Sequence, residues 1–511
     1  MLPPYLQEMQ RQVEVVARAC GLDFFETRFI LVDTKTINEV AAYGGFPSRY
    51  PHWRFGMEYD RLAKGSKYGL SKIYELVINN DPCYAYLLEG NNLVDQKMVM
   101  AHVMAHNDFF KNNTYFKFTN RKMIDEMANH AVKVQKIIDR VGIEPVENFI
   151  DVCHSLDNLI DPYSLFIARP PATRDELEDL LEEARAAAEG TPEPENGKKG
   201  APRSYMKGFL SPDRPGAGKR GPAETPPPSV QLRREPINPT RDVLAFLLHL
   251  APLEDWQRTI LELVREEAYY FAPQAMTKIM NEGWATFWHS RLMTHHLMDA
   301  SEVIQFAHTT SGVTAQAPGQ LNPYKMGVEL FRDIEHRWDR GLHGKEYRAC
   351  DDYEKKKHWD TGARDGLRKI FEVRRMHNDV TFIDEFLTPE FLTERLFYTY
   401  DYNRQKSEYV ISSREFAEIK NRLLFQLTNG GHPVISVTDA DYVNRGELLL
   451  EHRHYGVDLE LPYAKSTLEN LYLIWKKPVN LITQVKDRPT LLTFDGAGHA
   501  SRELPLSAIG G

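Results

Sequence analysis

Two histidines spaced four residues apart are the residues of this chain best suited to bind a metal ion. His102 and His106 lie in segment 95–110, DQKMVMAHVMAHNDFF, which reads as a helix that Asp95 can cap. At about 100° per residue, positions i and i+4 of a helix lie within about 40° of each other and one turn apart. Two imidazole nitrogens can then converge on one divalent ion, as in zinc-binding helices. Two buried histidines satisfied by hydrogen bonds are the alternative that the spacing leaves open.

The residue after the first histidine departs from the best-known zinc motif. In HExxH metalloprotease helices, a glutamate at that position acts as the general base. Val103 occupies it here. The segment therefore keeps the spacing of two metal ligands and lacks the usual base.

A second helical segment, 277–293 (TKIMNEGWATFWHSRLM), offers a carboxylate. Glu282 lies between Ile279 and Trp284 and has small neighbours that let another helix approach. An inward carboxylate is costly to bury without a partner, and a metal ion held by the histidine pair would be such a partner. Two histidines from one helix and a glutamate from another form the gluzincin ligand set, which leaves a fourth position for water. An ion pair or a helix-terminus contact explains Glu282 equally well.

Two residues near this segment are candidates for supporting roles. His289 shares a helix face with Glu282 but lies about 10 Å further along, which favours contact with a ligand residue or the substrate over metal binding. Glu266 is a candidate for the same roles. It and Glu267 precede an aromatic stretch with a proline, so one of them can face inward, although adjacent glutamates more commonly lie on a solvated helix face.

Two further carboxylates are candidates for catalysis. Glu75 lies on the otherwise apolar segment 68–80 and is a candidate general base. Asp108 lies on the helix of the histidine pair but points away from their face, which favours a role in orienting a neighbour.

Composition bounds the cellular setting. The chain has 511 residues and a formal net charge of −9, with no sustained run of Lys and Arg for nucleic acid or an anionic membrane to bind. Its apolar runs are far shorter than the about 20 residues of a membrane span, and residues 1–12 do not resemble a signal peptide. The four cysteines are scattered, without a CxxC pair. We therefore expect a cytoplasmic protein with no membrane span and no nucleic-acid partner.

The patterning divides the chain into four parts. Helical patterns dominate residues 1–190, which carry the histidine pair, and residues 241–375, which complete the same domain with Glu282. Between them, segment 191–240 is rich in Pro and Gly and lacks apolar periodicity, which predicts an extended or disordered insertion.

The fourth part, 376–511, has a different texture. Short β-branched or aromatic runs alternate with two helical patterns at 414–426 and 463–475; the runs lie at 396–402, 408–412, 434–437, 448–454 and 491–494. We therefore predict an α+β, predominantly helical protein. It would have a large zincin-like helical N-terminal domain and a smaller α+β C-terminal domain.

Three stretches of the chain resemble the SpoVR family (stage V sporulation protein R). They are YGLSKIYELVINNDPCYAYLLEGN from Tyr68, AHVMAHNDFFKNN from Ala101, and TKIMNEGWATFWH from Thr277. The likeness extends over nearly the whole chain except the Pro/Gly-rich insertion. The family pattern also carries His-x-x-x-His without the adjacent glutamate, so the absence of that glutamate at Val103 is not peculiar to this chain.

The resemblance implies a cytoplasmic bacterial protein but no settled reaction. The family is named for a role in forming the peptidoglycan cortex of spores, and it also occurs in bacteria that make no spores. There its genes tend to lie beside those of a serine protein kinase and a von Willebrand-like protein, which suggests a shared stress or stationary-phase pathway.

Two functions are compatible with these observations. The first is a metal-dependent hydrolase with zinc or another divalent ion at His102, His106 and Glu282, acting on an amide bond of a peptide or cell-wall precursor. The second is a non-catalytic regulatory or scaffold protein that keeps a structural metal and acts with a serine protein kinase or cell-wall enzymes. The inward ligand set favours the first function, and the missing base and large accessory domain favour the second.

Overall fold

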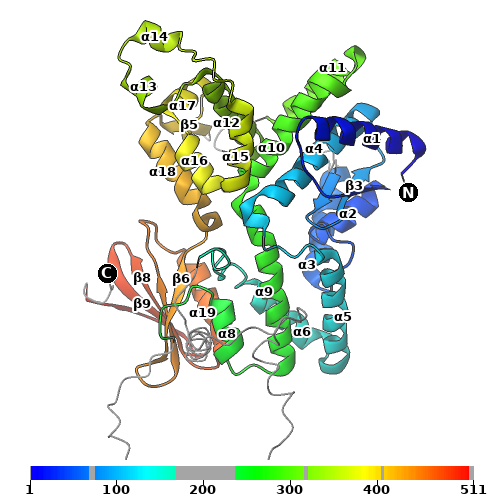
Figure 1. Ribbon diagram of the computed structural model, residues 1–511. Helices are drawn as coiled ribbons and strands as arrows, with labels where there is room; N and C mark the ends of the chain where they lie inside the picture. Colours follow the sequence, from blue (N-terminus) through cyan, green and yellow to red (C-terminus); the bar gives the residue numbers. More distant parts are fainter. Residues whose placement is uncertain (1, 68–74, 168–235, 316–319, 404–407, 506–511) are drawn as a thin grey trace, which may run out of the picture.

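The protein has a predominantly helical α+β fold (Figure 1). The computed structural model describes residues 2–67, 75–167, 236–315, 320–403 and 408–505. Most of the predicted insertion at 191–240 lies outside these residues. No helix in the described ranges is both long enough and apolar enough to cross a lipid bilayer.

The centre of the helical part is a row of long helices. α4 (Leu93–Asn112) packs against α10 (Lys278–Leu292), which packs in turn against α12 (Pro323–Arg340). The second contact is close because Gly283 of α10 meets Gly327 of α12, where a Cβ on either residue would overlap the backbone of the other helix. The surrounding helices are α1 (Pro4–Ala19), α11 (Val303–Val313) and α15 (Gly366–Met376). Enclosed in this way, α4 buries residues on all its faces.

A small sheet precedes α4 in the chain, and its strand β3 leads into that helix. β1 (Thr27–Val32) runs parallel to β3 (Cys83–Leu88), and β2 (Glu75–Ile78) pairs antiparallel with the other edge of β3. The sequence analysis did not separate these short strands from the helical patterns around them. The helices α2 (Thr34–Ala42) and α3 (Trp53–Lys67) follow β1.

A second core joins helices from the middle of the chain to the C-terminal sheet. The helices are α5 (Met123–Val141), α6 (Ile143–His154), α8 (Val243–Leu250) and α9 (Asp255–Met276). Buried side chains of α6, α8 and α9 share this core with buried side chains of the sheet and of α19 (Leu461–Trp475). α9 leads through Thr277 directly into α10, so one nearly continuous rod connects the two cores (Figure 1).

The C-terminal sheet has five strands in the order β10-β9-β8-β7-β6. All neighbouring strands pair antiparallel except β7 and β8, which are parallel. The helix α19 connects these two strands. The strands are β6 (Ile435–Tyr442), β7 (Glu447–His452), β8 (Val479–Val485), β9 (Arg488–Phe494) and β10 (His499–Glu503).

The segment between the helical part and this sheet packs on the first core. It contains α16 (Asp379–Phe386), α17 (Pro389–Arg395), the hairpin β4 (Thr399–Asn403) and β5 (Glu408–Ser413), and α18 (Phe416–Leu427). Phe382, Phe386 and Phe391 are buried in the core that also contains α4 and α10. The domain division at residue 376 stays a prediction, but apolar packing groups these helices with the N-terminal part. Short elements complete the fold: η1 (Thr114–Phe116), η3 (Met293–Leu297), η4 (Ala300–Glu302), α13 (Gly344–Ala349), α14 (Tyr353–Lys357) and η5 (Thr428–Gly431).

Candidate metal centre

Helix α4 is anchored at its start by an asparagine. The side chain of Asn92, in extended backbone conformation, accepts a hydrogen bond from the backbone N–H of Asp95 at 2.8 Å. Asn92 is therefore the N-cap, and the expectation that Asp95 caps the helix is wrong by one turn. Asp95 lies in the first turn instead, where its carboxylate accepts a hydrogen bond from Thr309.

Helix α10 is held at its start by a carboxylate from a distant segment. Thr277, its N-cap, makes no capping hydrogen bond with its side chain. Asp379 of α16 accepts hydrogen bonds from the backbone N–H groups of Ile279 (2.8 Å) and Met280 (2.9 Å). Complete burial raises the pKa of Asp379 to about 7, although these two hydrogen bonds oppose the shift. Asp379 thus accepts hydrogen bonds from two of the otherwise unpaired N–H groups at the N-terminus of α10, the helix that carries Glu282.

Asp108 connects α4 to α10 on the side away from the histidines. Its carboxylate accepts hydrogen bonds from Trp284 Nε1 and from the backbone N–H of Asp23, both at 2.8 Å, and lies 3.4 Å from Arg374 Nε. Burial raises the pKa of Asp108 to about 6. Asp108 thus contacts Trp284 of α10. Any effect of Asp108 on the histidines therefore passes through the packing of α4 against α10.

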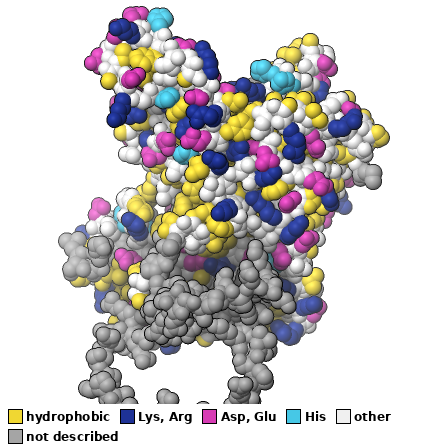
Figure 2. All heavy atoms as spheres, viewed as in Figure 1, with side chains coloured by type: hydrophobic (Ala, Val, Ile, Leu, Met, Phe, Trp, Pro, Cys, Tyr) yellow, Lys and Arg dark blue, Asp and Glu magenta, His cyan; other side chains and the backbone are white. Residues whose placement is uncertain are grey.

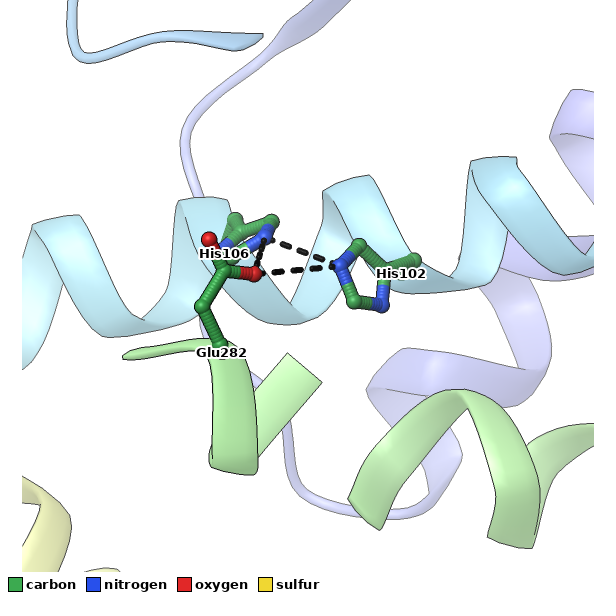
Figure 3. A group of neighbouring side chains, drawn as sticks. All are labelled: His102, His106 and Glu282. Carbon is green, nitrogen blue, oxygen red and sulfur yellow. Dashed lines mark hydrogen bonds and ion pairs between the residues drawn. The ribbon is translucent and has the colours of Figure 1, made fainter. Parts of the chain in front are cut away.

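His102, His106 and Glu282 meet between α4 and α10 (Figure 3). The Nε2 atoms of the two histidines are 3.0 Å apart. Oε2 of Glu282 lies 3.4 Å from His106 Nε2 and 3.7 Å from His102 Nε2. Each of the three residues is only 5–6% exposed. The three atoms form a nearly equilateral triangle inside the protein.

This triangle fits one face of a zinc tetrahedron. Nitrogen and oxygen ligands about 2.0–2.1 Å from a zinc ion in tetrahedral geometry lie about 3.3–3.4 Å from each other. The observed separations of 3.0, 3.4 and 3.7 Å bracket that value. Oε2 of Glu282 is buried without a hydrogen-bond partner among the described residues, as expected for an atom reserved for a cation.

The outward-facing nitrogens of both histidines are held by buried partners. Nδ1 of His106 lies 2.9 Å from Oδ1 of Asn281, and Nδ1 of His102 lies 2.8 Å from Nδ1 of His289. An amide oxygen only accepts, so Nδ1 of His106 carries the hydrogen, and Nε2 of the neutral ring presents its lone pair to the triangle. Such partners commonly fix the orientation of metal-binding histidines. Sequence reasoning missed Asn281, although its position next to Glu282 on a buried helix could have indicated it.

The electrostatics favour the protonation states that metal binding needs. Burial, and next the neighbouring His106, lower the pKa of His102 to about 4. Burial likewise lowers the pKa of His289 well below its usual value. Burial alone would raise the pKa of Glu282, but its contacts with both histidines, and next the charge of Lys278, outweigh burial and hold that pKa well below its usual range. At neutral pH the centre therefore offers a neutral His102 and a charged carboxylate.

Lys278 connects the centre to a large cavity. Its Nζ lies 2.6 Å from Oε1 of Glu282, one helical turn away, and its side chain is half exposed. Lys278 also lines a cavity of about 1490 Å³ that runs along α9. Aromatic side chains and charges of both signs contribute to the wall, among them Trp53, Arg54 and Phe271. On the face seen in Figure 2, basic and acidic side chains are likewise interspersed.

Two other predicted residues do not join the triangle. Glu266 lies on α9 beside His130, with Oε2 3.3 Å from His130 Nε2. Its neighbour Glu267 faces inward and pairs with Arg49 at 2.6 Å. Glu75 begins β2, where its backbone pairs with Leu87, and its side chain lies outside the described part of the chain. The role of Glu75 as a base stays a prediction.

Comparison with known proteins gives one consistent result. Residues 2–432 match the family model described as SpoVR like protein, and residues 433–486 match the SpoVR-like C-terminal domain. A protein of Escherichia coli K12, described as uncharacterized protein YcgB, is 31% identical over 95% of this chain and 92% of its own length. No solved structure matches the chain, so the zincin-like architecture stays a prediction.

Proposed function

The chain belongs to the SpoVR family, and from its buried histidine–glutamate triangle we propose that it is a metal-dependent hydrolase of amide bonds. The observation that carries the proposal is the convergence of His102 Nε2, His106 Nε2 and Glu282 Oε2 at separations of 3.0–3.7 Å. Zinc, or another divalent ion with similar ligand preferences, fits this donor set.

The residues of the centre divide the work between binding and orientation. The two histidines and Glu282 would hold the ion, and Asn281 and His289 would hold the histidine rings. A divalent ion bound there would supply Lewis acidity toward a carbonyl group and toward water. Lys278 fixes Oε1 of Glu282, which leaves Oε2 directed at the histidines.

The large cavity is the proposed approach for the substrate. Lys278 lies on its wall and contacts the ligand carboxylate, so a substrate in the cavity would reach the residue that adjoins the centre. Aromatic side chains and charges of both signs suit a peptide or cell-wall precursor, which carries apolar groups, amides, carboxylates and amines along one chain.

The general base is the least defined part of this proposal. Val103 is fully buried in the core, so nothing at the usual position of the base can accept a proton. Glu75 remains our proposed base. It begins β2, which pairs with β3, the strand that leads into α4.

The proposed cellular setting follows from the family. We place the protein in the cytoplasm, in formation of the spore cortex and its peptidoglycan or in stress physiology. A serine protein kinase and a von Willebrand-like protein of the same pathway are the proposed partners.

A second candidate is a regulatory or scaffold protein with a structural metal. Two observations favour it: the ligand residues are at most 6% exposed, and an apolar side chain replaces the base. In this function the ion would fix α4 to α10, and the protein would act on a kinase or on cell-wall enzymes.

Metal content and turnover, measured together, distinguish the two. Purified wild type and the variants His102→Ala and Glu282→Gln would be analysed for bound zinc and for hydrolysis of peptides and muropeptides. His295→Ala, a solvent-exposed histidine after α10, is the matched control. The hydrolase predicts zinc and turnover in wild type and control, and loss of both in the two site variants. Zinc without turnover on any substrate favours the scaffold, and absence of zinc from wild type contradicts both.

A further inference from the structure

A further histidine, outside the central triangle, lies among carboxylates where α5 packs against α9. His130 of α5 is completely buried, and its Nδ1 lies 3.0 Å from Oε1 of Glu267. The other oxygen of Glu267 accepts a hydrogen bond from Arg49 at 2.6 Å, and the side chains of this pair are only 4–5% exposed. A carboxylate on Nδ1 orients the ring and makes Nε2 a better ligand, as around metal-binding histidines generally.

Two further carboxylates lie close to the ring of His130. Oε2 of Glu266 lies 3.3 Å from its Nε2, and Glu126 lies one turn before His130 on α5. One oxygen of each glutamate and a ring nitrogen of His130 all lie within 4.8 Å of one another. Positions i and i+4 of one helix with a residue of a second helix repeat the arrangement of the central triangle.

The position of this group allows an ion to enter. Glu266 is exposed and Glu126 is half-buried. Glu266 also lines a cavity of about 320 Å³. The central triangle has no comparable exposure.

The charges of the group call for a cation. Glu126, Glu266 and Glu267 contribute three carboxylates, and the guanidinium of Arg49 pairs with that of Glu267. Burial alone would lower the pKa of His130, but its hydrogen bonds to Glu266 and Glu267 outweigh burial and raise that pKa to about 8, so a divalent ion would replace a proton on the ring. Without an ion, a proton on His130 shared with the glutamates is the alternative occupant.

We propose that Glu126, His130 and Glu266 form a second divalent-cation site, with Glu267 as the residue that positions His130. One nitrogen and two carboxylate oxygens suit zinc or manganese. An ion there fastens α5 to α9. Through Glu267 it also reinforces the position of Arg49, which lines the large cavity. This site is separate from the proposed hydrolytic centre and does not depend on it.

Zinc binding by the full chain tests the inference. The protein would be stripped with a chelator, and zinc per chain would then be measured by calorimetric titration for wild type, Glu282→Gln, and the double variant Glu126→Gln/Glu266→Gln. Wild type should bind two ions, and each of the two variants should lose one. Because the two glutamates are not fully buried, the double variant should fold. Glu262→Gln is the matched control, because Glu262 is exposed on α9, one turn before Glu266, and lines the same small cavity.

Each outcome bears on one site. If the double variant binds as many ions as wild type, or if Glu262→Gln loses as much binding as the double variant, the second site is overturned and His130 simply shares a proton. If Glu282→Gln keeps both ions while the double variant loses one, the second site stands and the central metal centre fails.

Discussion

The Nε2 atoms of His102 and His106 face each other at 3.0 Å within the core. Nδ1 of His106 is committed to Asn281, so its Nε2 presents a lone pair in the neutral ring. If Nδ1 of His102 donates to His289, its Nε2 does the same. Two lone pairs in such contact repel unless a proton or a cation lies between them. The carboxylate oxygen beside them completes the environment of a cation.

Asn281 should tune metal affinity without being a ligand. In Asn281→Ala, Nδ1 of His106 loses its acceptor, so the ring is no longer held with Nε2 toward the triangle. We expect zinc affinity to fall by about 10–100-fold, with one central ion still bound at saturation. Competition with a chelator of known affinity measures this, with His295→Ala as the control. Unchanged affinity would mean that the amide does not orient the ring.

Lys278 should affect turnover more than metal content. Lys278→Met removes the contact to Oε1 of Glu282 and a charge from the cavity wall, but leaves all three ligands. We expect the zinc content to stay at the wild-type value while hydrolysis of a peptide or muropeptide substrate falls. The control is Lys136→Met, an exposed lysine of α5. Wild-type turnover in Lys278→Met would contradict the proposed approach through the cavity.

The contact between α10 and α12 should not tolerate a side chain. In Gly283→Ala the new Cβ would overlap the backbone at Gly327, so one helix must move. Overpacking of this kind costs about 1–3 kcal/mol or more of unfolding free energy. Gly312→Ala in α11 is the matched control, because its Cβ meets no atom within 4 Å and should be neutral or slightly stabilising. Chemical denaturation of both variants would show the difference, and equal stability would refute the close packing.

Asp379 should make stability depend on pH. Burial raises its pKa in the folded protein to about 7, above its usual value of 3.8, so the folded state binds this proton more tightly. Its contribution to stability is therefore full below about pH 4 and is lost as pH rises toward 7, by at most about 1.4 kcal/mol per pH unit. Asp379→Asn keeps an acceptor for α10 but cannot ionise. Melting curves from pH 4 to 7 should thus decline more steeply for wild type than for Asp379→Asn, and parallel curves would contradict the shift.

Most residues of the candidate metal centre could be predicted from the sequence, because they follow patterns that are local in the chain. His102 and His106 are related by helix periodicity, and Glu282 is conspicuous as a carboxylate on an apolar helix. The structure brings the three together, and metal binding itself stays a prediction. Lys278 and Asn281 were missed because their roles depend on which way α10 faces α4. Asp379 was missed because nothing local relates it to a helix start 100 residues earlier.

In the fold, too, elements with a local sequence signal could be predicted, and packing between distant segments could not. The C-terminal runs at 434–437, 448–454 and 491–494 coincide with β6, β7 and β9, since short β-branched runs between turns are a local signal. The packing of α8 and α9 against that sheet joins segments more than 150 residues apart, and no periodicity encodes it. The inward turn of Glu267, with Glu266 beside His130, depends on the same long-range packing of α5 on α9.

Diffraction from zinc-loaded crystals at the zinc absorption edge tests the central claim most directly. We predict an anomalous peak about 2.0–2.2 Å from Nε2 of His102, Nε2 of His106 and Oε2 of Glu282. The peak should be absent in crystals of Glu282→Gln. A zinc-loaded crystal with no peak within bonding distance of these three atoms would contradict the claim.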